Sequence, residues 1–319
     1  MKITLDIDKL LVDGQINREE YERLKALATQ ETGSLAFNIL ISFGVVAAVV
    51  GALALVPSTI TAIALGLILA GSGIFFQRNH AQTWGILGTI LLLVGTLLAS
   101  GGILGLTDGG VVGFFLVTIL CALGGILTQR TLLMIIATLS LSATVGAMTM
   151  YGHATYTLVI RQPLITVILF SALGWGAYFF ALRLPMMYQH LAIAVSRTSL
   201  FLVNFGFWVG SLWGDSLWKQ DYSWSFGSGE IIPDWFFAMA WAIALIGTGI
   251  WAMGQNRRWA VNALATFGAI HFYTQYFERL GASPGTLLMA GMIALGIAVA
   301  IAKYNRTPTN RSAIAHSSH

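Results

Sequence analysis

The chain has 319 residues, of which 56% are hydrophobic and only 9% are charged. A soluble domain has about 25% charged residues, so this composition excludes a water-soluble globular protein, which could not cover its surface with polar groups. The formal net charge of +4 does not indicate nucleic acid as a partner, because the basic residues are spread over short segments and form no patch.

Residues 1–34 are the only sizeable polar segment, and we predict that they form a cytosolic helical hairpin. The first helix is expected to stop at Gly14, since glycine suits a left-handed helix end. The second helix is expected to begin with Asn17 as N-cap and Glu20 three residues later, a variant of the capping box. The hairpin either rests on the membrane surface or the cytosolic face of the bundle, or it serves protein-partner binding or self-association.

The run DKLLVDGQINREEYERLKAL within this segment carries leucines, a central glycine, an isoleucine, an acidic pair and an aromatic residue. It resembles the SHOCT helical hairpin, and it is also similar to the amino-terminal segment of the DUF2157 family of bacterial membrane proteins. In that family such a segment precedes a train of apolar helices. The resemblance implies a multi-pass protein of the bacterial cytoplasmic (inner) membrane, and it implies no biochemical role.

After Ser34 the hydropathy stays high, which predicts an all-α polytopic membrane protein with a lipid bilayer as its environment. The runs are helices and not barrel strands, because they lack period-2 alternation. We predict a bundle at 35–303, with 35–150 and 162–303 as candidate halves, and a disordered cytosolic tail at 304–319. About ten spans are expected, at 35–56, 58–77, 84–105, 110–128, 131–150, 162–182, 189–213, 234–253, 259–277 and 285–303.

The distribution of Lys and Arg predicts the orientation of these spans. If the amino terminus is cytosolic, most basic residues flank the cytosolic ends of the spans, and only Arg161, Lys219 and Arg279 fall on the other side. Both chain ends are therefore expected in the cytosol. Ten spans with cytosolic ends form a layout similar to that of the drug/metabolite transporter group.

The span at 189–213 carries a polar stripe that continues to Asp215. Arg197, Asn204 and Asp215 share one helical face with Phe201, Trp208 and Ser211, because the steps 197, 201, 204, 208, 211 and 215 alternate four and three. An arginine at this depth either snorkels to the cytosolic interface or pairs inside the bundle with carbonyls, hydroxyls, a lipid phosphate or an anionic ligand. We expect this helix to line a cavity.

A second polar stripe lies in the span at 259–277, where His271, Gln275 and Glu278 follow at i, i+4 and i+7. The stripe forms either interhelical hydrogen bonds or a proton-linked path that opens outward, with His271 titrating near neutral pH. This span is the expected partner of the helix that carries Arg197. The candidate ligand-binding or translocation residues are the polar residues of the two stripes: Arg197, Asn204, Asp215, His271, Gln275 and Glu278.

No catalytic signature is present, since the chain lacks H-E-x-x-H, G-x-S-x-G, Walker A and C-x-x-C motifs. We therefore expect no enzyme, no cofactor and no metal site. The single cysteine, Cys121, excludes an intramolecular disulfide and is expected to be a small buried residue. The best functional prediction is a transporter or permease for a small solute. The alternative is a membrane scaffold or sensor that docks partners through residues 1–34.

Overall fold

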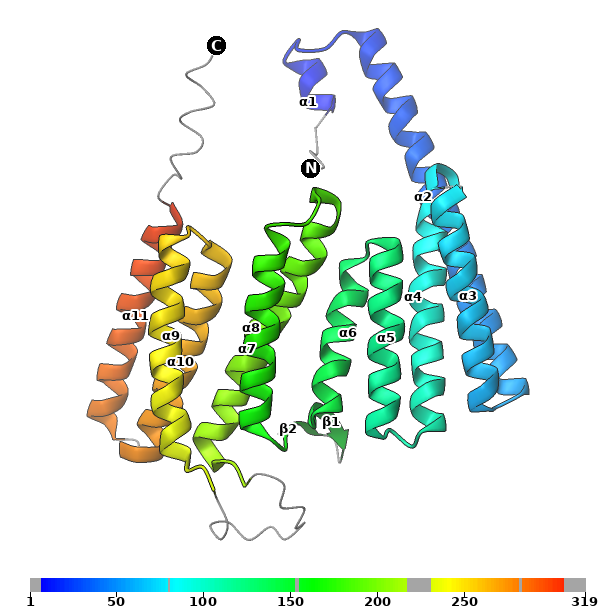
Figure 1. Cartoon of the computed structure of the whole chain (residues 1–319). Coiled ribbons are helices and arrows are strands. Elements are labelled where there is room, and N and C mark those ends of the chain that lie inside the picture. Colours follow the sequence, from blue (N-terminus) through cyan, green and yellow to red (C-terminus); the bar gives the residue numbers. More distant parts are fainter. Residues whose placement is uncertain (1–6, 80, 153–154, 217–230, 281–282, 307–319) are drawn as a thin grey trace. The chain divides into compact units, whose positions relative to one another are not determined.

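The computed structural model describes residues 7–79, 81–152, 155–216, 231–280 and 283–306 (Figure 1). These residues are almost entirely helical, as the composition predicts. The chain forms two compact units, a first unit of Met1–Leu133 and a second unit of Met134–His319. The candidate halves and the boundaries at residues 34 and 304 stay predictions.

The amino-terminal hairpin begins the first unit, and its capping prediction is confirmed. Asn17 Oδ1 accepts from the backbone N–H of Glu20 at 2.7 Å, and the Glu20 carboxylate accepts from the backbone N–H of Asn17 at 2.9 Å. Gly14 has a φ of +68°, the left-handed conformation expected at this turn. Tyr21 Oη donates to Asp8 Oδ1 at 2.8 Å and so ties the two helices of the hairpin together.

The first unit contains five complete helices among the described residues and the start of a sixth. The second hairpin helix and the first apolar run form one unbroken helix that crosses residue 34, and Pro57 lies between this helix and the next. The helices are α1 (Ile7–Val12), α2 (Arg18–Leu55), α3 (Thr59–Asn79), α4 (Ala81–Leu106), α5 (Val111–Thr128) and α6 (Thr131–Thr144), and the last continues into the second unit.

Helices α3 and α4 pack backbone to backbone through glycines. A Cβ atom added at Gly66 would lie 2.4 Å from the backbone nitrogen of Ala99, and one at Gly73 would lie 2.5 Å from that of Leu92. From the other side, a Cβ atom added at Gly95 of α4 would lie 2.4 Å from the backbone nitrogen of Ala70 of α3. Small residues permit such contacts, and tight van der Waals packing is a main source of helix association in lipid. The density of glycines therefore has a direct structural reason in this helix pair.

Polar side chains join other helices of the first unit. Arg130 Nη2, at the turn before α6, donates to Thr89 Oγ1 of α4 at 2.8 Å. Cys121 of α5 is fully buried, as predicted, with its sulfur 3.9 Å from Ser100 Oγ. These contacts hold α5 and the start of α6 against α4.

In the second unit a β-hairpin follows α6 and corrects one predicted span. The sequence predicts a helix over 131–150, but α6 ends at Thr144 and the chain then forms antiparallel strands that pair Ala147 with Ile160. Gly146 has a φ of +82°, which turns the chain out of the helix. Beyond it the sequence is rich in Thr, Tyr, Val and Ile, which favour strands. The strands are β1 (Ala147–Gly152) and β2 (Thr155–Ile160).

Five helices follow the β-hairpin in the second unit: α7 (Pro163–Ala181), α8 (Met186–Trp213), α9 (Asp234–Gly254), α10 (Arg258–Leu280) and α11 (Pro284–Arg306). The core lies where α7, α8, α9 and α10 meet, around the fully buried Trp241 and the nearly fully buried Phe237. The predicted tail at 304–319 is helical as far as Arg306, and the rest of it lies outside the described residues.

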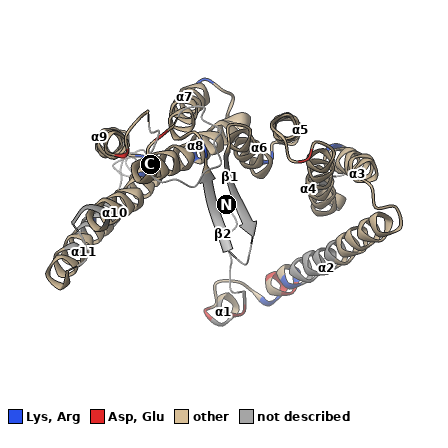
Figure 2. Ribbon diagram, turned by 90° about the horizontal axis from the view of Figure 1, so that it is seen from below, with Lys and Arg blue, Asp and Glu red and all other residues tan. Residues whose placement is uncertain are grey.

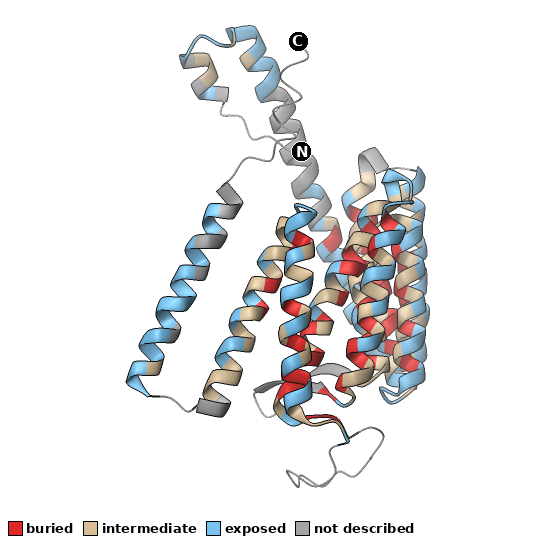
Figure 3. Cartoon of the chain, turned by 60° about the vertical axis from the view of Figure 1, so that its left-hand side comes forward, coloured by how far each residue is buried: buried red, intermediate tan, exposed pale blue. Residues whose placement is uncertain are grey.

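The surface of the helices fits a lipid environment. Charged residues gather near helix ends and connections, while the helix bodies are almost free of them (Figure 2). Buried residues collect on the faces where helices meet, and long stretches of the outer faces are exposed (Figure 3). These outer faces carry large apolar side chains, such as Ile243 at 68% exposure. Contiguous exposed apolar surface of this kind is rare on soluble monomers.

Among the described residues, six helices are long and apolar enough to cross a membrane by length and composition: α3, α4 from Trp84, α5, α7, α8 and α9. Shorter apolar stretches lie in α2 (40–55), α6 (131–144) and α11 (284–296). The helix α10 is not among the six. The chain is thus a helical protein with the features of a multi-pass membrane protein, and the count of ten crossings stays a prediction.

The glycine contacts of α3 predict a position-specific loss of stability. The Gly73→Ala substitution should lower the free energy of unfolding by about 1–3 kcal/mol, because the new methyl group would overlap the backbone of α4. Thermal unfolding of the purified protein in detergent would measure the effect. Gly71→Ala is the matched control, since a Cβ there meets nothing within 4 Å. Equal melting temperatures for the two variants would contradict the packing described.

Candidate functional site

A cavity of about 180 Å³ lies among α7, α8, α9 and α10 in the second unit, and it is partly open to the surroundings. Most of its walls are aromatic and aliphatic, and Ser171, Ser196 and Thr248 contribute hydroxyl groups. Small-molecule sites are commonly mostly apolar with a few polar groups. The lining residues are Phe170, Ser171, Gly174, Trp175, Tyr178, Ser196, Leu200, Val203, Phe207, Ala244, Thr248, Trp251, Trp259 and Ala260.

Helical periodicity explains how these residues come to one place. On α8 the lining positions 196, 200, 203 and 207 follow steps of four and three, and on α9 the positions 244, 248 and 251 do the same. Such steps place side chains on one face of a helix. The absence of a side chain at Gly174 brings α7 close to α8, since a Cβ there would lie 3.1 Å from Ser199 Cβ.

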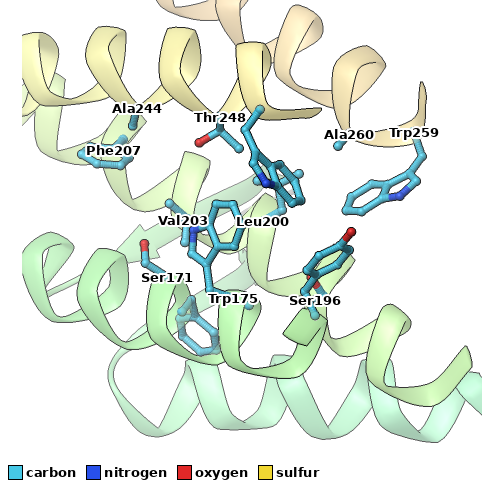
Figure 4. Close-up of a pocket in the computed structure, with 14 residues that line it drawn as sticks. Ser171, Trp175, Ser196, Leu200, Val203, Phe207, Ala244, Thr248, Trp259 and Ala260 are labelled. Atoms are coloured by element: carbon cyan, nitrogen blue, oxygen red, sulfur yellow. The ribbon is translucent and has the colours of Figure 1, made fainter. Parts of the chain in front are cut away.

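Aromatic rings form one end of the cavity. Trp251 meets Trp175 edge to face at a centroid distance of 4.5 Å and Tyr178 in the same way at 5.1 Å. Figure 4 shows Trp259 at this end of the cavity and Phe207 with Ala244 at the other. Edge-to-face pairs are stabilised by the ring quadrupoles, so these rings hold one another in fixed positions.

Two arginines touch rings that line the cavity. The Arg197 guanidinium carbon lies 4.9 Å from the centroid of the Trp259 ring. The Arg257 guanidinium carbon lies 5.4 Å from the centroid of Tyr178, and its Nε donates to Tyr178 Oη at 3.1 Å. Both are cation–π contacts, in which the ring face attracts the positive charge. The cavity therefore has positive charge at its aromatic end.

The predicted stripe of α8 packs against α9 and α10. Phe201 meets Phe267 of α10 edge to face at 5.6 Å, and Trp208 Nε1 donates to Thr274 Oγ1 of α10 at 3.2 Å. Together with the Arg197 contact to Trp259, these contacts show that α10 touches α8, as predicted, although α7 and α9 contact α8 more extensively. They also place most of the stripe in a helix interface, and the binding role of its residues stays a prediction.

Asn204 and His271, predicted on different stripes, meet the same side chain. Trp241 Nε1 donates to Asn204 Oδ1 at 2.9 Å, and Asn204 Nδ2 donates to the Leu200 carbonyl at 2.8 Å. The Trp241 ring also packs edge to face on the His271 ring at 4.7 Å. Asn204 is 3% exposed and Trp241 is fully buried, so this contact joins α8, α9 and α10 in the interior.

Asp215 has a structural position at the end of α8. Its Oδ2 accepts from the backbone N–H of Leu164 at 2.8 Å, in the first turn of α7, and the residue is 2% exposed. A carboxylate at a helix N-terminus satisfies a free donor and complements the helix dipole. The Asp215 backbone also forms an antiparallel bridge with Ile232. Asp215 thus links α7, α8 and the segment before α9.

The remaining predicted site residues lie on α10, away from the residues that line the cavity. His271 Nδ1 is buried without a hydrogen-bond partner among the described residues. Gln275 is half-buried one turn further along the helix. The side chain of Glu278 lies outside the described residues. The structure therefore brings Asn204 and His271 together through Trp241, and it places none of the five predicted residues with described side chains in the wall of the cavity.

The cavity residues of α8 lie one position before the predicted stripe. Positions 196, 200, 203 and 207 precede 197, 201, 204 and 208, and one residue turns an α-helix by about 100°. The polar residues drew attention to the stripe, whereas the neighbouring face lines the cavity. A sequence signal for the cavity was the position of Trp175, Tyr178, Trp251 and Trp259 near the ends of α7, α9 and α10.

The contact between Asn204 and Trp241 predicts a loss of stability on substitution. Asn204→Ala should destabilise the protein by about 1–3 kcal/mol, because the buried indole N–H loses its acceptor. Ser199→Ala is the control on the same helix. Ser199 is also fully buried, but its hydroxyl has no partner among the described residues, so its removal should cost little. Thermal unfolding in detergent distinguishes them, and an equal effect of both substitutions would contradict this assignment.

Comparisons of the chain with protein-family models, with curated proteins and with solved structures found no match. The resemblance of residues 8–27 to the DUF2157 segment therefore stays a prediction. Because function depends on sites and not on folds alone, the functional argument starts from the cavity and its neighbouring charges.

Proposed function

We propose that this chain is a permease-like protein of the bacterial cytoplasmic membrane that binds and passes a small solute. The observation that carries the proposal is the cavity among α7, α8, α9 and α10. Three of these helices, α7, α8 and α9, are long and apolar enough to cross a membrane. Secondary transporters hold their solutes between membrane helices, and a cavity in this setting supports the same use.

In this proposal α2 to α11 provide ten crossings, and both chain ends lie in the cytosol. Arg183 lies in the connection from α7 to α8, and Arg257 in the connection from α9 to α10. Positive residues are enriched in cytosolic connections, which supports this orientation. Tyr178 and Trp251 are each three residues from the ends of α7 and α9, so the aromatic end of the cavity would lie toward the cytosol.

A permease must expose its cavity to each side of the membrane in turn, and this requirement can be tested without knowing the solute. Cys121 is the only cysteine and is replaced first by Cys121→Ala. A Thr248→Cys variant in that background then carries one thiol in the cavity wall. A membrane-impermeant maleimide should label it in both inside-out and right-side-out vesicles, with faster labelling from the cytosolic side.

The matched control is Ile246→Cys, two residues away on the same helix. Ile246 is 65% exposed on the outer face of α9, where a thiol would face lipid and should react slowly with a water-soluble reagent. Labelling of the Thr248→Cys variant from one side alone, or from neither side, would contradict a permease.

A second candidate function, a membrane scaffold or sensor, is supported by the amino-terminal hairpin. The capping box and the hydrogen bond from Tyr21 to Asp8 give this short segment a defined structure. Its charged residues, including Glu19 and Glu22, are exposed. A defined and exposed polar hairpin supports a role in protein-partner binding or self-association.

Deletion of residues 1–16 tests this second function, because it removes α1 and leaves α2 to begin at its own N-cap, Asn17. A scaffold that self-associates through the hairpin should change from an oligomer to a monomer in light scattering after size-exclusion chromatography. A permease that does not use the hairpin should keep its mass and the labelling of the Thr248→Cys variant. An unchanged mass together with unchanged copurifying proteins would speak against the scaffold.

A further inference from the structure

We propose that the ligand of the cavity is an amphiphilic anion, with an apolar body among the aromatic rings and a carboxylate or phosphate bound by Arg197 and Arg257. This inference rests on the proposed binding function and names the chemical class of the solute. It depends on three observations: the contacts of the two arginines with rings of the cavity wall, their unused donors, and the composition of that wall.

Each guanidinium group lies against a ring of the cavity wall, and neither arginine lines the cavity itself. Arg197 belongs to α8, and Arg257 precedes α10 directly. Their ring partners, Trp259 and Tyr178, both line the cavity. Two positive charges held against these rings create a local field that favours a negative group beside the cavity.

Most donors of these arginines remain available for a ligand. A guanidinium group has five N–H donors in one plane. Arg257 uses its Nε toward Tyr178, and Arg197 presents its carbon to the Trp259 ring, which does not consume an N–H donor. Within the part of the chain that the structure describes, neither arginine forms an ion pair with a carboxylate. Planar oxyanions match guanidinium geometry and bind it with two hydrogen bonds.

The cavity wall fits the apolar part of such a ligand. Trp175, Trp251 and Phe207 provide aromatic surface, and Leu200 and Val203 provide aliphatic surface. None of the lining residues is charged. At about 180 Å³ the cavity takes a small apolar body, or one segment of a larger molecule. A small highly polar solute would leave its hydrogen-bonding groups unpaired against this wall, which is unfavourable.

The positive charge of the two arginines decides whether the aromatic cavity favours an anionic or a cationic ligand. Aromatic cages also bind quaternary ammonium groups through cation–π contacts. Here, however, the faces of Trp259 and Tyr178 already hold guanidinium groups, and a cationic ligand would add a third positive charge. Like charges repel one another. The same geometry attracts an anion.

The experiment uses three probes with one apolar body and different charges: 3-phenylpropionate, 3-phenylpropanol and 3-phenylpropylammonium. Their affinities for the full chain in phosphatidylcholine nanodiscs are measured by isothermal titration calorimetry. The propionate should bind on the order of tenfold or more tightly than the other two, because only it can accept charge-assisted hydrogen bonds from both arginines.

Single substitutions assign the binding to the two arginines. Arg197→Gln and Arg257→Gln should each weaken propionate binding about tenfold and change propanol binding less than about twofold. Arg183→Gln is the matched control, because Arg183 is an exposed arginine in the α7–α8 connection and, unlike Arg197 and Arg257, makes no cation–π contact with a ring of the cavity wall. Arg197→Lys keeps the charge and loses the planar donor pair, so it should show an intermediate effect. Melting temperatures of all variants identify any that fail to fold.

A second arm distinguishes a free solute from a lipid headgroup. Nanodiscs that contain phosphatidylglycerol should leave propionate affinity unchanged if the site takes a free anion. They should weaken it if the anionic headgroup occupies the arginines, and either result fits the proposed chemistry.

Equal or tighter binding of propanol or propylammonium would overturn the anion assignment. In that case the Thr248→Phe substitution, which fills the cavity, is the next test. If it abolished the binding of propanol or propylammonium, the cavity would still be a binding site, but not one for anions. Failure of all three probes, together with unlabelled Thr248→Cys, would overturn both the ligand class and the permease proposal. Loss of propionate binding in Arg183→Gln to the same extent as in Arg197→Gln would also contradict the assignment.

Discussion

The buried hydrogen bond from Trp241 to Asn204 is the interaction on which the second unit depends. It gives a partner to two polar groups that would otherwise be costly in an apolar interior. The same indole packs on His271, so three helices meet at one side chain. These helices provide most of the cavity wall, and Asp215 fixes the fourth, α7, through its first turn. The polar residues Asn204, His271 and Asp215 therefore serve to position the helices of the second unit.

The two units use different physical means to hold helices together. In the first unit Gly66, Gly73 and Gly95 let α3 and α4 approach until their backbones touch. At these glycines no large side chain separates the two helices. In the second unit large rings, such as Trp175, Trp251 and Phe237, fill the space between helices. Rings of different orientation do not fill that space completely, and the cavity lies among them. The difference in packing explains why a binding function is proposed for the second unit.

The proposed ligand class follows from the relation between charge and rings. The sequence alone left Arg197 with two explanations, snorkelling or an internal partner. In the structure its guanidinium lies on Trp259, a ring of the cavity wall, and a second arginine, Arg257, lies on another such ring, Tyr178. The ring satisfies part of the charge and leaves the N–H donors available. An anion on an apolar body complements both the donors and the wall.

Composition, periodicity and capping residues determined the helical class, the capped start of α2 at Asn17 and most helix positions, because these depend on local backbone preferences and on apolar runs. The polar stripes also predicted that α8 and α10 touch, but not that α7 and α9 contact α8 more extensively. Local signals could not show that the helix over 131–150 stops at Thr144, since the hairpin after it requires pairing with residues further along the chain. Nor could they choose the face of α8 that lines the cavity. Only the packing of α7, α9 and α10 decided that, because neighbouring faces of one helix differ by a single residue and each can be buried against a different partner.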